Sequence, residues 1–310
     1  MTPVFRVEKP GLLTTIQDLG RLGAIGSGVP PGGAMDRFAH RAANLLVGND
    51  PGTATLECTL TGPLLVSEQA CRIAIAGADF DPQVNGAPAP MWTTVELEAG
   101  DRLIFGGRTS GARTYIAVAG GFEGERWLGS RSTSIMAGKG GYEGRALKAG
   151  DLLSTAGGGT SPGRRELSFE LRPTYADHVL AAMPGPHARR LSREDRRLLF
   201  SAPFTVSSQS DRMGCRLDGP PLAGTGEELL SYGLVAGALQ LPRSGRPILL
   251  LADHQTAGGY PVVATVVSAS LPQAGQLAPG DEVRFVETTA LQARRRREEI
   301  SSALSSLVAR

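Results

Sequence analysis

The chain contains little cysteine, little lysine and no long apolar run. Its three cysteines, Cys58, Cys71 and Cys215, are widely spaced and form no CxxC pair, which argues against a disulfide framework or a zinc site. We expect them to be buried thiols in a reducing compartment. No apolar stretch approaches the ~18 residues that a membrane helix needs, and the first residues lack an apolar signal core. These absences predict a cytoplasmic protein with no membrane segment.

The charge balance argues against a dedicated nucleic-acid binder. The formal net charge is +2, whereas neutralisation of phosphates usually requires a strongly basic domain. Lysine occurs only at Lys9, Lys139 and Lys148, so 29 of the 32 basic residues are arginine. This excess fits planar anion recognition, but a bias in codon composition is the favoured explanation.

The composition predicts a mainly β protein with a few helices. The 41 glycines and 21 prolines make up one fifth of the 310 residues, against an average of about 12%. Short β-branched runs bounded by turn residues recur along the chain and predict strands. The clearest runs are 72–76, 93–97, 114–119, 204–207, 248–251 and 261–267.

A Gly-Asp turn that leads into a strand occurs three times, at Gly100-Asp101, Gly150-Asp151 and Gly280-Asp281. The first and third share the pattern x-Gly-Asp-x-aliphatic-x-Phe, about 180 residues apart. Two related β-barrel halves would produce this repeat, and so would ordinary hairpin chemistry. The pattern alone leaves both explanations open.

Three segments have helical periodicity. Residues 35–47 begin near Asp36 and end at Gly48, residues 192–200 begin with Ser192 as a cap, and residues 290–310 repeat apolar positions at helical spacing. A glycine-rich stretch, 156–166, predicts a linker. We therefore expect a β lobe over 1–155, the linker over 156–166, a second β lobe over 167–288 and a helix over 289–310.

Several catalytic and cofactor motifs are missing. The sequence has no P-loop, no complete dinucleotide fingerprint, no Gly-x-Ser-x-Gly elbow and no clustered histidine spacing for a metal. It also lacks the Met-Lys-Met form of a biotin attachment site. Any reaction driven by ATP or biotin would therefore need a nucleotide site or carrier that is shared with, or supplied by, another chain. We expect no resident metal.

Polar segments follow predicted strands at three places, 130–133, 208–214 and 252–261. Polar groups at the ends of apolar strands lie where a barrel opens, a favoured position for ligand sites. Gly258 and Gly259 would let backbone N–H groups approach an oxyanion closely. The competing explanation is that the acidic and hydroxyl side chains cap turns while the arginines pair with them.

These segments belong to a series of motifs that resembles a known family. In order, the motifs are Thr14-Thr-Ile-Gln-Asp-Leu-Gly-Arg21, Gly28-Val-Pro-Pro-Gly-Gly-Ala-Met-Asp36, Ala43-Asn-Leu-Leu-Val-Gly-Asn49, Leu56-Glu57, Gly77-Ala-Asp79, Gly129-Ser-Arg-Ser-Thr133, Ser210-Asp-Arg-Met-Gly214, Gln240-Leu-Pro242 and Asp253-His-Gln-Thr-Ala-Gly-Gly-Tyr-Pro261. Over about residues 3–290 the chain resembles the family called allophanate hydrolase subunit 2 or biotin-dependent carboxyltransferase, which includes the C-type 5-oxoprolinase subunits. Small departures are Pro31-Gly32, where Ser-Gly is common, and His254, where Arg or Lys is common.

The resemblance implies two cyclophilin-like β-barrel lobes and a multi-chain enzyme. The expected partners are a subunit-1-type protein, like the B-type chain of 5-oxoprolinase, and a third chain like its A-type chain. Together they would open 5-oxo-L-proline to L-glutamate with ATP, and this chain alone would be inactive. Relatives also carboxylate urea from carboxybiotin, and others regulate a histidine kinase through the subunit-1-type protein. The absence of a fused carboxylase favours the oxoprolinase role.

The chemistry of amide activation assigns roles to the motif residues. Opening a lactam requires donors for developing negative charge on oxygen and a carboxylate that orients the amide or acts as a base. We expect Asp211 and Asp253 to be the catalytic carboxylates. The expected substrate-binding residues are Arg131, Arg212, Gln240, Gln255, Thr256 and Tyr260, the two arginines binding anionic oxygens. Ion pairing of Asp211 with Arg212 for structure alone is the alternative.

Overall fold

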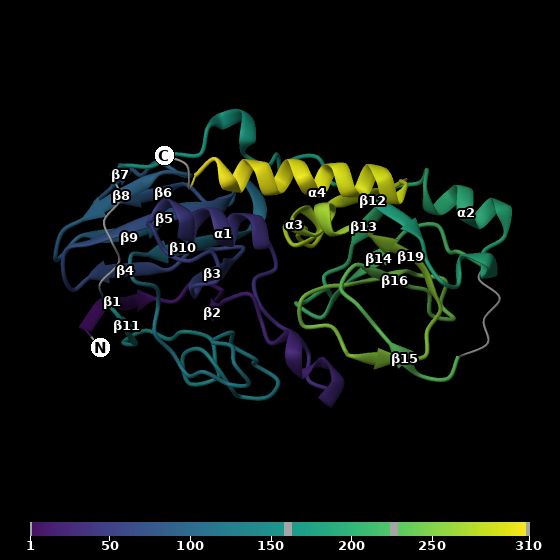
Figure 1. Cartoon of the computed structure of the whole chain (residues 1–310), viewed down its shortest axis with the longest axis horizontal. Helices are drawn as coiled ribbons and strands as arrows, with labels where there is room; N and C mark the ends of the chain where they lie inside the picture. Colours follow the sequence, from purple (N-terminus) through teal and green to yellow (C-terminus); the bar gives the residue numbers. More distant parts are fainter. Residues whose placement is uncertain (1, 158–162, 224–228, 308–310) are drawn as a thin grey trace. The chain divides into compact units, whose positions relative to one another are not determined.

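The computed structural model describes residues 2–157, 163–223 and 229–307, and it confirms the mainly β class (Figure 1). Its contacts divide the chain into two units. Unit 1 comprises Met1–Arg21, Gly32–Ala176 and Ser301–Arg310, and unit 2 comprises Leu22–Pro31 and Asp177–Ile300. These units differ from the sequence-based domains, because 22–31 group with the second unit and 167–176 with the first. Residues 158–162 of the expected linker lie outside the described residues.

Unit 1 consists of two sheets that enclose an apolar core, rather than one closed barrel. The first sheet has the order β11-β1-β4-β9-β6-β7 and the second β2-β3-β10-β5-β8. The strands of the first are β1 (Thr2–Lys9), β4 (Leu64–Ser67), β6 (Pro82–Val84), β7 (Ala87–Pro88), β9 (Arg102–Phe105) and β11 (Leu152–Thr155). Those of the second are β2 (Leu13–Gln17), β3 (Thr55–Thr59), β5 (Cys71–Asp79), β8 (Thr94–Leu97) and β10 (Ser110–Val118).

The alternation of side chains along a strand divides the second sheet into two faces. Ile16, Leu56 and Ile116 turn one way into the core, which also contains β1 and β4 residues. Polar and small residues occupy the other face, against which helix α1 (Arg37–Leu46) packs. As predicted, Asp36 begins this helix, its carboxylate accepting from the backbone N–H groups of Phe38 and Ala39.

Unit 2 contains a closed seven-stranded barrel with the order β12-β19-β16-β17-β14-β13-β20. Its strands are β12 (Val179–Pro184), β13 (Phe204–Val206), β14 (Gly214–Asp218), β16 (Ala238–Gln240), β17 (Ile248–Leu250), β19 (Val262–Val266) and β20 (Glu282–Glu287). Strands β12 and β20 run parallel and close the ring. A short ribbon of β15 (Tyr232–Gly233) and β18 (Ala257–Gly258) is a separate two-stranded sheet.

The remaining helices follow the sequence pattern closely. Ser192 caps α2 (Arg193–Leu199), as expected, and α4 (Ala290–Ser305) lies within the predicted C-terminal helix, of which 308–310 lie outside the described residues. The other helical segments are α3 (Leu271–Ala274), η1 (Leu22–Ser27), η2 (Phe169–Leu171), η3 (Ala188–Arg190) and η4 (Ser268–Ser270). No helix in the described ranges is long and apolar enough to cross a membrane.

The three Gly-Asp turns have the same geometry. In each, glycine takes a left-handed φ, of 92° at Gly100, 92° at Gly150 and 88° at Gly280. In each, the following aspartate accepts a hydrogen bond from the backbone N–H three residues before it, at 2.7, 2.7 and 2.8 Å. The turns precede β9, β11 and β20 respectively, so the same turn chemistry occurs in both units.

The three cysteines are free thiols. Cys58 and Cys215 are buried as expected, and burial raises the pKa of Cys58 to about 12. The expectation was wrong for Cys71, which is only half-buried at the start of β5 and contacts the Ser67 hydroxyl at 3.4 Å.

Candidate functional site

The centre of the candidate site is an ion pair between Arg212 and Asp253 in unit 2. The Nε and Nη2 atoms of Arg212 donate to the two carboxylate oxygens of Asp253 at 2.9 and 3.1 Å. The backbone reinforces the pair, because the Asp253 N–H donates to the Arg212 carbonyl at 2.9 Å. Arg212 precedes β14 and Asp253 follows β17, and these strands pair antiparallel, with Gly214 opposite Leu250. The register therefore brings two residues 41 positions apart to the same end of the barrel wall.

This pairing changes the expected chemistry of both residues. The side chain of Arg212 is 8% exposed and its charge is matched by Asp253, whose side chain is 23% exposed. A two-point guanidinium–carboxylate pair is strong and fixes both groups in one plane. A carboxylate has about four lone-pair positions, so Asp253 retains acceptor capacity toward solvent. The pair is therefore better suited to orienting an N–H donor than to capturing a free anion.

His254 lies beside this pair and is almost completely buried, at 2% exposure. Its Nδ1 lies 2.7 Å from the Gln255 carbonyl oxygen; because a carbonyl only accepts, Nδ1 carries the proton. Burial lowers the pKa of His254, although the Gln255 carbonyl and the Asp253 charge act in the opposite direction. His254 is thus a neutral group at pH 7, unlike the Arg or Lys common at this position in the resembling family.

Gln240 and Gln255 form a second pair. Gln255 donates from Nε2 to the Gln240 Oε1 at 3.1 Å, and Gln240 is 1% exposed. The Gln240 Nε2 is buried and has no hydrogen-bond partner within the described residues. Gly258 leaves room for this amide, because a Cβ there would lie 3.2 Å from Nε2 and 3.0 Å from Leu234. An orphaned buried donor of this kind requires a partner, since leaving it unbonded costs about 1–3 kcal/mol.

The other predicted residues of unit 2 are not gathered at the Arg212–Asp253 pair. Asp211 is exposed, and its Oδ1 accepts from the N–H groups of Met213 and Gly214, at 2.8 and 3.2 Å. Thr256 accepts from the Leu234 N–H through its carbonyl, at 2.9 Å. Tyr260 lines a hollow near the other end of β14. The Asp211 carboxylate thus caps a turn.

We expected Gly258 and Gly259 to let backbone N–H groups approach an oxyanion. In the structure, Gly259 lies against the backbone of Leu229. The Gly259 carbonyl accepts from the Leu229 N–H at 2.9 Å. A Cβ on Gly259 would lie 2.5 Å from the Leu229 carbonyl oxygen. The small residues here allow two backbone segments to approach closely.

Arg131 belongs to unit 1 and is already paired. Its Nη2 contacts the Glu123 carboxylate at 2.6 Å, and its backbone N–H donates to Asp18 Oδ2 at 2.6 Å. The same Asp18 carboxylate accepts from the hydroxyls of Ser130 and Ser132, both at 2.6 Å, and from the Gly20 N–H at 2.8 Å. Burial alone would raise the pKa of Asp18, but these hydrogen bonds together lower it below its usual value.

Beneath α1 lies a buried polar layer that was not among the predicted site residues. The Tyr115 hydroxyl donates to Glu57 Oε2 at 2.7 Å and accepts from the Asp36 N–H at 2.8 Å. Tyr175 donates to Asp36 Oδ2 at 2.6 Å, and His40 Nδ1 lies 2.9 Å from the Thr55 hydroxyl. Burial is the main cause that raises the pKa of Tyr115 and lowers that of His40 to about 3. Glu57 and Asp36 belong to quoted motifs, so the sequence already singled them out. The motifs did not predict that tyrosine side chains would be their partners.

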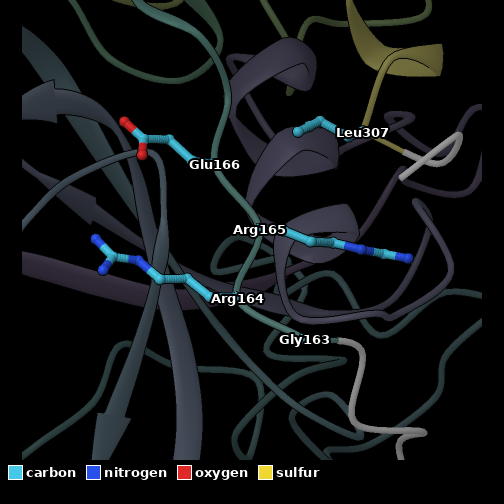
Figure 2. Close-up of a pocket in the computed structure, with 5 residues that line it drawn as sticks. All are labelled: Gly163, Arg164, Arg165, Glu166 and Leu307. Carbon is cyan, nitrogen blue, oxygen red and sulfur yellow. The ribbon is translucent and has the colours of Figure 1, made fainter.

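A smaller hollow of about 260 Å³ lies in unit 1 and contains no predicted site residue. It is lined by Gly163, Arg164, Arg165, Glu166 and Leu307, and Arg165 points away from Arg164 and Glu166 (Figure 2). Arg165 donates from Nη1 to the Leu45 carbonyl at 2.9 Å. It thereby satisfies a carbonyl of the last turn of α1, which is a structural role. Within the described residues no cluster of His, Cys, Asp or Glu could hold a metal ion.

Comparisons with known proteins find relatives that match nearly the whole chain. The chain is 36% identical to the C-type 5-oxoprolinase subunit of Escherichia coli K12, over 96% of this chain and 95% of that protein. It is also 36% identical to a putative urea carboxylase of Emericella nidulans, over 96% of this chain but 25% of that protein. The crystal structure of Kluyveromyces lactis urea carboxylase is similar with a TM-score of 0.92 and 31% identity, covering 99% of this chain and 29% of that one.

A family model confirms the resemblance derived from the motifs. The model is described as the carboxyltransferase domain, subdomains A and B, and it matches residues 27–287. That range includes Arg131, the Arg212–Asp253 pair and the Gln240–Gln255 pair. The chain belongs to the carboxyltransferase-domain family, subdomains A and B.

Proposed function

We propose that this chain is a subunit of an ATP-dependent 5-oxoprolinase that opens 5-oxo-L-proline to L-glutamate. The observation that carries the proposal is the reach of the match to the C-type 5-oxoprolinase subunit of Escherichia coli, which includes 95% of that protein and residues of both units. The protein of the same name from Haemophilus influenzae is 36% identical over 90% of this chain and 89% of its own length.

The proposed chemistry centres on Asp253. Its carboxylate, held by Arg212, accepts the lactam N–H and fixes the ring while the amide oxygen is activated elsewhere in the complex. Gln240 and Gln255 supply amide donors to the polar groups of the substrate, and the Gln240 Nε2 has no hydrogen-bond partner among the described residues. Arg131, Thr256, Tyr260 and Asp211 remain predictions for the assembled enzyme.

The proposed complex includes a subunit-1-type protein, the B-type chain, and a third, A-type chain. ATP is a co-substrate in this proposal and is bound mainly by another chain. The missing P-loop in the sequence supports this placement of the nucleotide site. This chain alone is then inactive.

A second candidate, carboxyl transfer to urea or a related amide, is favoured by a separate observation. The chain is as identical to the putative urea carboxylase as to the oxoprolinase subunits. The structural match to the Kluyveromyces lactis urea amidolyase also covers 99% of this chain, although it covers only 20% of that chain. In this alternative, carboxybiotin comes from a carrier on another chain.

Reconstitution discriminates between the two. We expect the chain, combined with A-type and B-type partners, to release glutamate from 5-oxo-L-proline in step with ATP hydrolysis, and omission of any chain to abolish it. Asp253→Asn should abolish most turnover, while Glu282→Gln, an exposed change on β20, serves as the matched control. Carboxylation of urea by the chain with a carrier loaded with carboxybiotin, without glutamate release from 5-oxoproline, would overturn the proposal in favour of the alternative.

A further inference from the structure

A second hollow, in unit 2, does not include the Arg212–Asp253 pair, and Tyr260 is the one predicted site residue in its described lining. It measures about 460 Å³, within the range of small-molecule sites. Its lining comes from the end of β13, from β14, from the turn between β16 and β17, and from the start of β19. The lining residues that carry the argument are Ser207, Arg216, Asp218, Ser244, Arg246 and Tyr260.

Backbone hydrogen bonds hold these walls in place. Ser207 donates its N–H to the Arg216 carbonyl at 2.9 Å, and Leu217 donates to the Pro247 carbonyl at 3.0 Å. The turn at Gly245 donates to the Pro242 carbonyl at 3.0 Å. The hollow is therefore formed by fixed backbone and belongs entirely to unit 2.

Of the two arginines that line the hollow, Arg216 is available to bind a ligand. Arg246 pairs with Asp218 at 2.8 Å, but the two side chains are 65% and 48% exposed, and such exposed pairs are weak. Arg216 is exposed, and its guanidinium has no ion pair or side-chain hydrogen bond within the described residues. Two arginines and one aspartate give the lining a formal charge of +1.

Two hydroxyls add neutral donors. Ser207 Oγ accepts from the Gln209 N–H at 3.3 Å, and Ser244 Oγ accepts from the Arg246 N–H at 3.4 Å. Each hydroxyl hydrogen has no acceptor within the described residues. Both hydroxyls are therefore able to donate to an oxyanion, beside an apolar wall of Ile248 and two prolines.

We propose that this hollow binds a small molecule with a single carboxylate group. Arg216 matches a carboxylate with two parallel N–H donors, and one unit of positive charge balances one carboxylate. A phosphate monoester, with a charge of about −1.5 to −2 at pH 7, would exceed the charge of the lining. The ligand's apolar body packs against Ile248 and the Tyr260 ring.

The site is distinct from the Arg212–Asp253 pair. Arg216 lies within β14, whereas Arg212 precedes that strand in a turn. The lining of the hollow includes Arg216 but neither Arg212 nor Asp253. The proposal therefore does not depend on which amide the assembled complex cleaves.

Ligand-observed NMR titration of the purified chain tests the proposal. We expect 5-oxo-L-proline and benzoate to bind and compete with each other, and 2-pyrrolidinone, the same lactam without a carboxylate, not to bind. Arg216→Gln should weaken binding at least tenfold, and Arg246→Gln by about threefold because Asp218 already holds that guanidinium. Arg284→Gln, an exposed arginine on β20 of the same barrel, is the matched control and should leave the dissociation constant unchanged.

Three results would overturn this assignment. Equal binding of 2-pyrrolidinone would exclude carboxylate recognition, and full affinity in Arg216→Gln would exclude this hollow. Binding of inorganic phosphate or ATP that Arg216→Gln abolishes, without binding of the carboxylates, would make it a phosphate site. Benzoate has no lactam N–H for Asp253 to accept, so failure of the benzoate titration is separate from failure of the proposed oxoprolinase activity.

Discussion

The carboxylates of Asp18 in unit 1 and Asp253 in unit 2 are both partly buried, but their partners differ. Asp18 accepts four hydrogen bonds, two from serine hydroxyls and two from backbone N–H groups, which fill its acceptor positions. Asp253 accepts its two side-chain bonds from one guanidinium. The first carboxylate closes a loop onto a strand, and the second leaves acceptor positions open.

This difference separates a structural carboxylate from a candidate catalytic one better than burial does. A group whose acceptors are all occupied by its own chain has no capacity for a ligand, however polar its motif. Asp18 stands in one quoted motif, and Ser130 and Ser132 stand in another. The hydrogen bonds between these two motifs therefore stabilise the fold. Asp253 combines a fixed orientation with free acceptor capacity, which is the requirement for orienting a substrate.

The largest expected effect is on catalysis by Asp253. In the reconstituted complex, Asp253→Asn should lower kcat by about 30- to 1,000-fold, because loss of a charged contact made in the transition state costs about 2–4 kcal/mol. The melting temperature should fall by a few degrees, because Asn retains the size of the side chain but leaves the buried Arg212 guanidinium without its counter-charge, so kcat is measured per folded molecule. Measurement of kcat and melting temperature, with Glu282→Gln as control, checks the prediction.

The opposite result would reassign the pair. An unchanged kcat per folded molecule, with a melting temperature lowered by several degrees, would mean that Arg212 and Asp253 form a structural ion pair. Arg212→Ala complements this test, although it leaves Asp253 uncompensated and therefore carries a larger expected cost in stability.

A substitution at Asp18 should mainly lower stability, whereas the substitution at Asp253 mainly lowers kcat. Asp18→Ala leaves two hydroxyls and two N–H groups without their acceptor, and we expect the free energy of unfolding to fall by about 2–3 kcal/mol. Urea unfolding measures this change. Asp50→Ala is the matched control, because Asp50 Oδ1 accepts only from the Gly52 N–H in an exposed turn. Equal losses in the two variants would contradict the idea that the four-bonded carboxylate is a fold-closing element.

Much of the fold was predictable because its signals are local. Asp36 and Ser192 cap their helices as predicted, and the strands at 72–76 and 114–119 coincide with parts of β5 and β10. The Gly-Asp turns depend on a left-handed glycine and an aspartate that bonds back by three residues, both visible in sequence. Chemistry of this kind needs no knowledge of distant partners.

The assembly of the site was less predictable because it depends on strand register. Arg212 and Asp253 meet only because β14 and β17 pair with Gly214 opposite Leu250. Asp18 and Ser130 are 112 residues apart. Nothing in the motif segments specified that Arg131 would pair with Glu123, or that Tyr260 would line a hollow apart from Asp253. Residues 22–31 likewise group with residues 177–300, and residues 301–307 group with residues 32–176, although each segment is remote in sequence from most of its unit.

The polar layer of unit 1 should also make stability depend on pH. Burial lowers the folded-state pKa of His40 to about 3, so the folded protein keeps His40 neutral while the unfolded chain takes up a proton below about 6.5. Stability is therefore complete above pH ~6.5 and falls by about 1.4 kcal/mol per pH unit below it. At pH 5 the loss from His40 is about 2 kcal/mol. Urea unfolding of wild type and His40→Gln from pH 5 to 7.5 should give a steeper slope for wild type, and equal slopes would contradict a buried neutral His40.

The smallest expected effect comes from a carboxylate that lies in a surface turn. Asp101 accepts from the Glu98 N–H at 2.7 Å through Oδ2 and from Asn85 Nδ2 at 2.7 Å through Oδ1. The Glu98 bond and then the Asn85 bond lower its pKa, so its contribution is present above the unfolded pKa of about 3.9 and fades as the pH falls through the folded value. Because water competes for both donors, Asp101→Ala should cost about 1 kcal/mol at pH 7, less than Asp18→Ala, and this cost of Asp101→Ala should shrink near pH 3. Urea unfolding at pH 7 and pH 3 measures both values. A loss at Asp101 as large as that at Asp18 would mean that the number of accepted hydrogen bonds does not determine what a carboxylate contributes to this fold.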